Sequence, residues 1–154
     1  MSVSDRDSRK AREKFSTFLK SRRLKQTQQR LDILNKLLSL DTHVNAEELY
    51  GVIRDKNPSM GYSTVYRTLK LLTECGLAKD HHFGDGITRY ESCFNRDHHD
   101  HIVCLECHEI FEFENEKIEE LQKKVAENLD FTILDHRLEI YGICKNCKLS
   151  KETS

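Results

Sequence analysis

The first half of the chain contains four segments in which apolar residues recur every three or four positions, the spacing of an amphipathic helix. This spacing predicts helices over residues 6–23, 26–40, 45–57 and 61–72. For the third helix, Asn45 and Glu48 form a typical capping box, and Leu49, Val52 and Ile53 are the expected buried face. For the fourth, we expect Ser63 or a neighbour to cap the start and Gly76 to end the helix.

A β-hairpin follows these helices. Two strands are predicted, over residues 77–83 and 87–93, and the turn Gly84-Asp85-Gly86 joins them. A hairpin after three helices is typical of a winged helix, the helix-turn-helix variant that binds DNA. The fourth helix would then read the major groove through hydroxyl, phenol and basic side chains, which are Ser63, Thr64, Tyr66, Arg67 and Lys70.

The second half alternates strand and helix. Residues 91–101 are interpreted as a polar linker, 110–113 as a strand, and a helix from Asn115 is expected to present Ile118, Leu121, Val125 and Leu129 on one face. Residues 131–141 alternate with period two and predict a strand with His136 among apolar side chains, where a core histidine and a metal ligand are both open interpretations. The fold class is therefore α+β, with a winged-helix domain over residues 1–92 and an α/β domain over residues 93–154.

Charge separates the two halves more clearly than the net charge of -1 indicates. Residues 1–92 contain 17 Lys and Arg against 12 Asp and Glu, whereas residues 93–154 contain 8 against 14. A solvated helix surface explains part of the basic excess. The asymmetry also favours a nucleic-acid-binding half joined to a cation-binding half. Lys25, in the basic N-terminal part, is a candidate contact to phosphate or to an A·T-rich minor groove.

The expected cellular location favours metal over disulfide for the paired cysteines among the six in the chain. The N-terminal residues are polar and lack the apolar region of a secretory signal, and the sequence contains no apolar stretch of about 20 residues that would span a membrane. We therefore expect a cytoplasmic protein with no membrane partner. Thiols stay reduced there, so paired cysteines more often bind metal.

Two Cys-x-x-Cys pairs supply four soft ligands: Cys104, Cys107, Cys144 and Cys147. This is the donor set of a closed tetrahedral zinc site. A disulfide, a redox pair or four buried thiols are the alternatives. The redox interpretation requires a cysteine that opens a helix within a βαβ unit, whereas Cys104 follows Ile102-Val103 in what resembles a hairpin.

A second metal is indicated by the run His98-His99-Asp100-His101 beside the first pair. Four thiolates already fill a zinc site, so these imidazole and carboxylate ligands point to another divalent ion, for which iron, manganese, zinc and cobalt are all suitable. A solvated polar turn is the alternative interpretation of the run.

Three segments resemble the ferric uptake regulator (Fur) family: Gly61 to Arg67, His98 to Cys107 and Leu138 to Cys144, within a match from about Lys25 to Cys147. The resemblance implies a winged-helix domain hinged to an α/β dimerisation domain in a metal-dependent transcription repressor, and no enzymatic activity. It also implies operator DNA and a homodimer, possibly a tetramer, as partners. Its metals would be structural Zn(II) and regulatory Fe(II), for which Mn(II), Co(II) or Zn(II) can substitute.

The resemblance also assigns ligands. Structural zinc would be bound by the four cysteines named above. The regulatory hinge site would take His43, Glu91, His99, His101 and Glu112. An accessory site would take His98, Asp100, Glu119 and His136. Three features depart from the usual pattern: the longer spacing from Glu91 to His99, His108 where glycine is common, and Cys75 and Cys93, which have no family role and are expected to be buried thiols.

The function predicted from these residues is an iron-responsive repressor that controls iron uptake and homeostasis genes. Members that sense peroxide, zinc or manganese are the nearest alternative, and peroxide-sensing members use Asp where this chain has Glu91 and Glu112. A zinc-dependent hydrolase or deaminase is an alternative from another class, but neither His-x-Glu nor His-Glu-x-x-His occurs in the sequence. A bare zinc-ribbon interaction module would leave the winged helix without a purpose.

Overall fold

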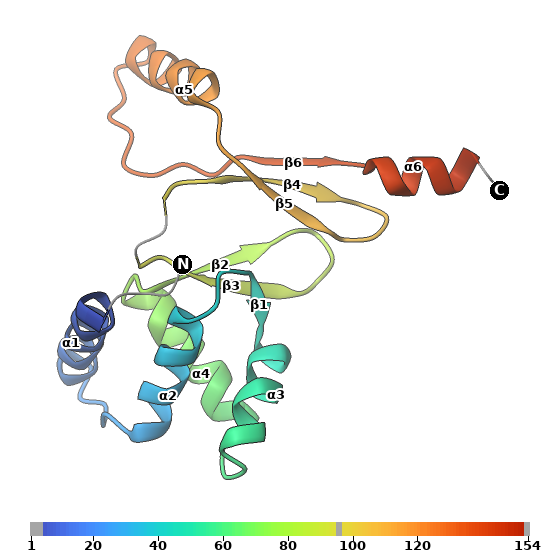
Figure 1. The fold of residues 1–154 in the computed structure, drawn as a ribbon. Coiled ribbons are helices and arrows are strands. Elements are labelled where there is room, and N and C mark those ends of the chain that lie inside the picture. The colour runs from blue at the N-terminus through green and yellow to red at the C-terminus, as the bar shows by residue number, and fades with distance from the viewer. Residues whose placement is uncertain (1–4, 95–96, 153–154) are drawn as a thin grey trace. The chain divides into compact units, whose positions relative to one another are not determined.

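The computed structural model describes residues 5–94 and 97–152. The chain divides into two compact units, Met1–Arg96 and Asp97–Ser154, and each unit is described by itself (Figure 1). The division falls after Arg96, four residues beyond the boundary placed from the sequence.

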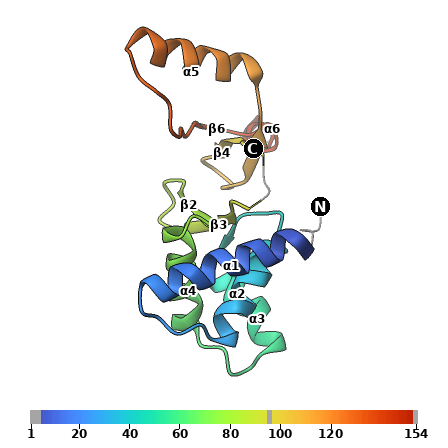
Figure 2. The ribbon, with the colours of Figure 1, turned by 90° about the vertical axis from the view of Figure 1, so that its left-hand side faces the viewer.

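Four helices build the body of the first unit: α1 (Asp5–Ser21), α2 (Gln28–Leu38), α3 (Ala46–Lys56) and α4 (Tyr62–Glu74). Their apolar stripes meet in one core whose fully buried members include Phe15, Leu34, Leu49, Leu69 and Leu72. α1, seen along its length in Figure 2, is joined to α2 by a hydrogen bond from Arg12 Nε to Asn35 Oδ1 of 2.9 Å. The basic N-terminal helix is therefore part of the winged-helix unit.

The helix ends explain why these segments stop and start where they do. The capping box of Asn45 and Glu48 at α3 is confirmed. Of the candidates around Ser63 for the cap of α4, Ser63 itself is wrong: Gly61 is the N-cap, and no side chain accepts a hydrogen bond there. Gly76, at φ +74°, ends α4 as predicted. Val52 is 43% exposed, since the packing of α3 buries Leu49 and Ile53 but does not extend to Val52.

An antiparallel sheet of order β1-β3-β2 completes this unit, formed by β1 (Val44–Asn45), β2 (Ala78–His82) and β3 (Thr88–Ser92). β2 and β3 are the predicted hairpin. Glu91 and Ser92 lie in β3 and are buried, so the polar linker expected from residue 91 is wrong at its start. The short strand β1 was not predicted, because two residues carry no periodic signal.

The second unit contains a sheet of order β5-β4-β6, in which β4 (Asp100–Cys104) pairs antiparallel with β5 (Ile110–Phe113) and parallel with β6 (Glu139–Gly142). The helices α5 (Glu116–Asn128) and α6 (Lys145–Glu152) follow β5 and β6. Asn115 caps α5 as expected, through its side chain and the amides of Lys117 and Ile118. The helix α6 was not predicted.

The long strand predicted over residues 131–141 is wrong for most of its length. Only Glu139–Gly142 forms a strand, and Leu134 is 94% exposed. The ladder begins where β4 offers a partner, with the His101 amide donating to the Leu138 carbonyl at 3.2 Å. Residues before Leu138 have no strand opposite them among the described residues, so alternation alone could not make them a strand. Within residues 5–94 and 97–152, no helix has the length and apolar character needed to cross a membrane.

Candidate metal centres and nucleic-acid interface

The four cysteines meet in the second unit. Cys104 ends β4, and Cys107 lies in the turn after it. Cys144 directly precedes α6, and Cys147 lies in its first turn. The Sγ atoms of Cys104 and Cys147 are 3.9 Å apart, as are those of Cys107 and Cys144. Four thiolates about 2.3 Å from one tetrahedral zinc ion would be about 3.8 Å apart. The predicted set therefore has the size of a zinc site.

The pKa values of Cys104 and Cys147 differ strongly. Amide hydrogen bonds, first from Cys107 and then from Cys144, lower the pKa of Cys104 to about 6. The pKa of Cys147 is raised to about 12, first by its hydrogen bond with Cys144 and then by burial and the other thiols. Thus the Cys104 thiolate forms readily, and a bound dication would stabilise the thiolate of Cys147.

The run His98-His99-Asp100-His101 is divided by the alternation of an extended chain. His98 and His99 directly precede β4, and His98 lies against Asp100 while His99 lies against His101. This is the grouping expected when side chains alternate along an extended chain. Opposite His101 on β5 stands Glu112, its cross-strand partner. One short segment therefore supplies ligands to two different sites.

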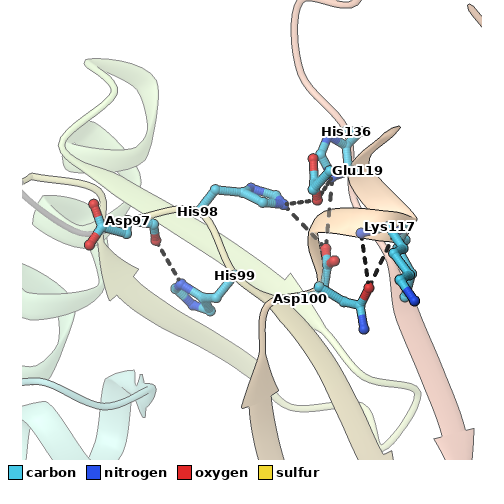
Figure 3. A network of polar contacts seen from close by, with 9 residues as sticks. Asp97, His98, His99, Asp100, Lys117, Glu119 and His136 are labelled. Carbon is cyan, nitrogen blue, oxygen red and sulfur yellow. Dashed lines mark hydrogen bonds and ion pairs between the residues drawn. The ribbon is translucent and has the colours of Figure 1, made fainter. Parts of the chain in front are cut away.

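The accessory cluster gathers His98, Asp100, Glu119 of α5 and His136, whose side chains point toward one another in Figure 3. Glu119 Oε1 lies 3.3 Å from Nε2 of both histidines. Asp100 Oδ1 lies 3.4 Å from Nε2 of His98 and 3.9 Å from Nε2 of His136. Ligands about 2.1 Å from a four-coordinate ion would be about 3.4 Å apart, so the cluster fits a divalent cation.

Unsatisfied polar atoms support the same conclusion. Asp100 is 1% exposed, and among the described residues neither of its carboxylate oxygens has a hydrogen-bond partner. The same holds for Glu119 Oε1 and His136 Nε2. Buried polar groups without partners are costly, and a bound cation would compensate all of these atoms at once. His136 is therefore a ligand-competent side chain and not a core histidine on a strand.

The other face of β4 carries the second-unit part of the predicted regulatory set. The imidazoles of His99 and His101 lie edge to face at 5.0 Å between centroids, and His99 Nε2 is 3.7 Å from Glu112 Oε1. The Asp97 carbonyl accepts a hydrogen bond from His99 Nδ1 at 3.0 Å, also drawn in Figure 3. Because Nδ1 is the donor, Nε2 of a neutral imidazole has its lone pair on the side of Glu112, the arrangement of a metal ligand.

The first unit contains the remaining part of that set. The side chains of His43, directly before β1, and of Glu91 in β3 are 6% and 5% exposed. His43 Nε2 lies 3.4 Å from Glu91 Oε2. A third buried residue, His81 of β2, contacts Glu91 and was not predicted from the sequence. The only available signal was the period-two placement of His81 in the hairpin, and it does not distinguish a site residue from a core residue.

The predicted DNA-contacting side chains lie on the outer face of α4. Its buried side is formed by Val65, Thr68, Leu69 and Leu72. Ser63, Tyr66 and Arg67 are exposed, and Thr64 and Lys70 are half-buried. Lys70 Nζ lies 5.8 Å from the Tyr66 ring centroid, a cation–π contact that orients both side chains. Lys25 is exposed between α1 and α2, and its carbonyl accepts a hydrogen bond from Arg30.

A winged helix joined to a unit with clustered metal ligands defines a class of protein, the metal-dependent DNA-binding regulators. The model of the ferric uptake regulator family matches residues 21–141 of this sequence. The chain belongs to the ferric uptake regulator family, whose members are transcription regulators and not enzymes.

Similarity to individual proteins supports the same family. The ferric uptake regulation protein of Neisseria meningitidis serogroup C is 41% identical over 139 residues, covering 88% of this chain and 96% of the relative. The peroxide-responsive repressor PerR of Staphylococcus aureus is 34% identical over 122 residues, covering 79% of this chain and 81% of the relative. Among solved structures, the ferric uptake regulator Fur of Helicobacter pylori, which has three functional metal-binding sites, superposes with a TM-score of 0.82 at 30% identity, over 92% of this chain and 93% of that one.

Proposed function

We propose that the protein is an iron-responsive transcription repressor that binds operator DNA as a homodimer when Fe(II) occupies a regulatory site. One observation carries the proposal: each unit presents a histidine–carboxylate pair, His43 with Glu91 in the first and His99 with Glu112 in the second. These pairs, together with His101, form the regulatory ligand set. Because these ligands come from both units, a metal bound by all of them would link the DNA-binding unit to the dimerisation unit.

The regulatory ion acts through differential affinity. Bound by residues of both units, it favours the arrangement of the two winged helices that fits successive major grooves, and so raises operator affinity. A metal that bound every arrangement equally would shift nothing. Imidazole nitrogen and carboxylate oxygen suit Fe(II), and Mn(II), Co(II) or Zn(II) can occupy the same ligands.

The other two sites have supporting roles in this proposal. Structural Zn(II) is bound by the four cysteines and ties the turn after β4 to α6. The accessory site of His98, Asp100, Glu119 and His136 lies wholly within the second unit, so a cation there stabilises that unit without linking it to the first. Its occupation therefore supports the response without switching it.

Dimerisation involves the second unit. No residue of α5 is buried within the chain, although Leu121, Val125 and Leu129 follow one another at helical spacing and are 59% or more exposed. An apolar helix face of this kind is typical of a surface that a partner covers. A second copy of the chain is the proposed partner, and pairs of dimers are compatible with the same surfaces. Because the target is operator DNA, the proposal includes a cytoplasmic location.

Titration of operator binding with Fe(II) or Mn(II) under anaerobic conditions tests the proposal. His99→Ala should abolish metal-stimulated binding while zinc content and dimer remain unchanged. The matched control is His136→Ala, a histidine-to-alanine change at the accessory site, which should keep most of the response. Loss of the response in His136→Ala with retention in His99→Ala would reverse the two assignments.

The same binding experiment with added hydrogen peroxide distinguishes an iron-responsive repressor from a peroxide sensor, the nearest alternative function. Operator binding by the Fe(II)-loaded protein should survive a brief exposure to hydrogen peroxide. The reason is that this chain has Glu91 and Glu112 at the two positions where peroxide-sensing members of the family have Asp. Rapid release from the operator at low peroxide, without release of the Mn(II)-loaded protein, would make the protein a peroxide sensor instead.

A further inference from the structure

Glu91 uses its two carboxylate oxygens differently. Oε1 lies 2.9 Å from Nε2 of His81, and Oε2 lies 3.4 Å from Nε2 of His43. All three side chains are 5–6% exposed. The carboxylate therefore stands between two imidazoles in a site from which water is largely excluded.

The two separations indicate two kinds of contact. A distance of 2.9 Å is typical of an N–H···O hydrogen bond, whereas 3.4 Å is longer than the usual range of about 2.7–3.2 Å. It matches the spacing of about 3.4 Å between two ligands of one ion. An ionised carboxylate only accepts, so Nε2 of His81 carries the proton of the short contact and has no lone pair for a metal.

Packing holds the His81 ring in this orientation. His81 and Glu91 are diagonal neighbours on one face of the β2–β3 ladder, in which His81 stands opposite Arg89 and Lys79 opposite Glu91. The ring stacks on Phe83 with 5.5 Å between centroids and 10° between planes. The ring also makes an edge-to-face contact with His43, at 5.1 Å between centroids.

We propose that His81 is a positioning residue of the regulatory site: its Nε2–H bond to Oε1 fixes the Glu91 carboxylate so that Oε2 faces the same ion as His43. The inference rests on the proposed function, in which His43 and Glu91 are ligands. A carboxylate held by a buried donor needs no reorientation when metal binds. Loss of that donor removes one constraint on the Glu91 carboxylate and raises the cost of binding.

The test compares substitutions at His81 in the full-length chain. A His136→Ala background removes the accessory site, and Mn(II) affinity is measured together with the visible spectrum of the Co(II)-loaded protein. His81→Leu removes the donor, and His81→Asn is too short to place one at the Nε2 position. Both should weaken Mn(II) binding by about 10- to 100-fold, the usual effect of losing such a partner, and should alter the Co(II) bands.

His81→Gln is the rescue variant, because its amide nitrogen reaches about the position of Nε2 and donates the same bond. It should restore Mn(II) affinity to within about threefold of the background protein and preserve the Co(II) spectrum. The matched control is His82→Leu, at the neighbouring histidine whose side chain is 62% exposed, and it should leave both measurements unchanged. The Asn and Gln variants keep a polar side chain, so the comparison stands even if the Leu variant does not fold.

Two results would overturn the inference. Mn(II) affinity in His81→Asn equal to that of the background would show that the bond does not position Glu91. An equal loss in Gln and Asn would make the imidazole itself necessary, as a ligand. A different result would contradict the proposed function itself. If His43 is not a metal ligand, His43→Ala in the same background would keep the Mn(II) affinity of the background protein, whichever residue stands at position 81.

Discussion

His98 and Glu119 lie 3.3 Å apart, Nε2 to Oε1, although 21 positions separate them in the sequence and one precedes β4 while the other belongs to α5. His136 stands at the same distance from the same oxygen. Glu119 therefore ties the helix to both histidines of the accessory site. A cation bound there would connect α5 to the sheet and would stabilise the second unit.

The first prediction follows from that connection. Glu119→Gln removes the charge shared by both histidines, so metal should bind the accessory site more weakly and raise the Tm less than it does in the wild type. Differential scanning fluorimetry across a Zn(II) or Mn(II) titration measures this. Glu120→Gln is the control, since Glu120 is the exposed neighbour on α5 and should behave as wild type. Equal metal-induced Tm shifts in both variants would remove Glu119 from the site.

The cysteine site should be essential for folding of the second unit. Cys104→Ser leaves three thiolates, and structural zinc contributes on the order of 10 kcal/mol in small modules, so we expect loss of stoichiometric zinc and of the dimer. Metal analysis and sedimentation velocity measure the two effects. Cys75→Ser is the control: Cys75 is buried in the first unit, and its substitution should spare zinc. A Cys104→Ser protein with full zinc and a native dimer would contradict the assignment.

Tyr66 should carry sequence preference. It is 44% exposed on α4 and is oriented by Lys70, so Tyr66→Ala should cost about 1–3 kcal/mol of discrimination between operator and unrelated DNA. Competition binding at fixed salt measures this value. Tyr66→Phe keeps the ring and separates stacking on a base or methyl group from hydrogen bonding by the hydroxyl. Unchanged affinity and selectivity in Tyr66→Ala would place the recognition surface elsewhere.

The contribution of the β2–β3 hairpin to folding stability should depend on pH. Arg89 Nη2 lies 2.7 Å from Asp85 Oδ2, and this bond lowers the pKa of Asp85 from 3.8 to about 2. A depressed carboxyl pKa stabilises the fold above the unfolded value, and this contribution is lost as pH falls through the folded value.

We therefore expect Asp85→Asn to lower the free energy of unfolding by about 1 kcal/mol at neutral pH. The difference from wild type should shrink as pH falls from about 4 toward 2. Urea denaturation at several pH values measures it. Glu74→Gln is the control, because Glu74 pairs with Arg22 on the surface, where both side chains are about half exposed. A difference for Asp85→Asn that stayed constant down to pH 2 would rule out the ion pair as its cause.

Local signals in the sequence were sufficient for much of this protein. The four helices and the hairpin were predictable because helical periodicity, the capping box at Asn45 and the glycine turn are contained within a few residues. The four cysteines were predictable as one site because their spacing and number match a tetrahedral ion. Family resemblance, and not pattern, supplied His43, Glu91 and Glu119.

Only the tertiary structure decided the contacts within the ligand groups that the family resemblance assigned. Glu119 of α5 lies 3.3 Å from both His98 and His136, and His101 of β4 stands opposite Glu112 of β5. The contact between His81 and Glu91 depends on the register of the hairpin. The start of β6 at Glu139, and not at residue 131, depends on where β4 offers a pairing partner. These are pairings between segments distant in the chain, and their free energy comes from partners that a local pattern does not contain.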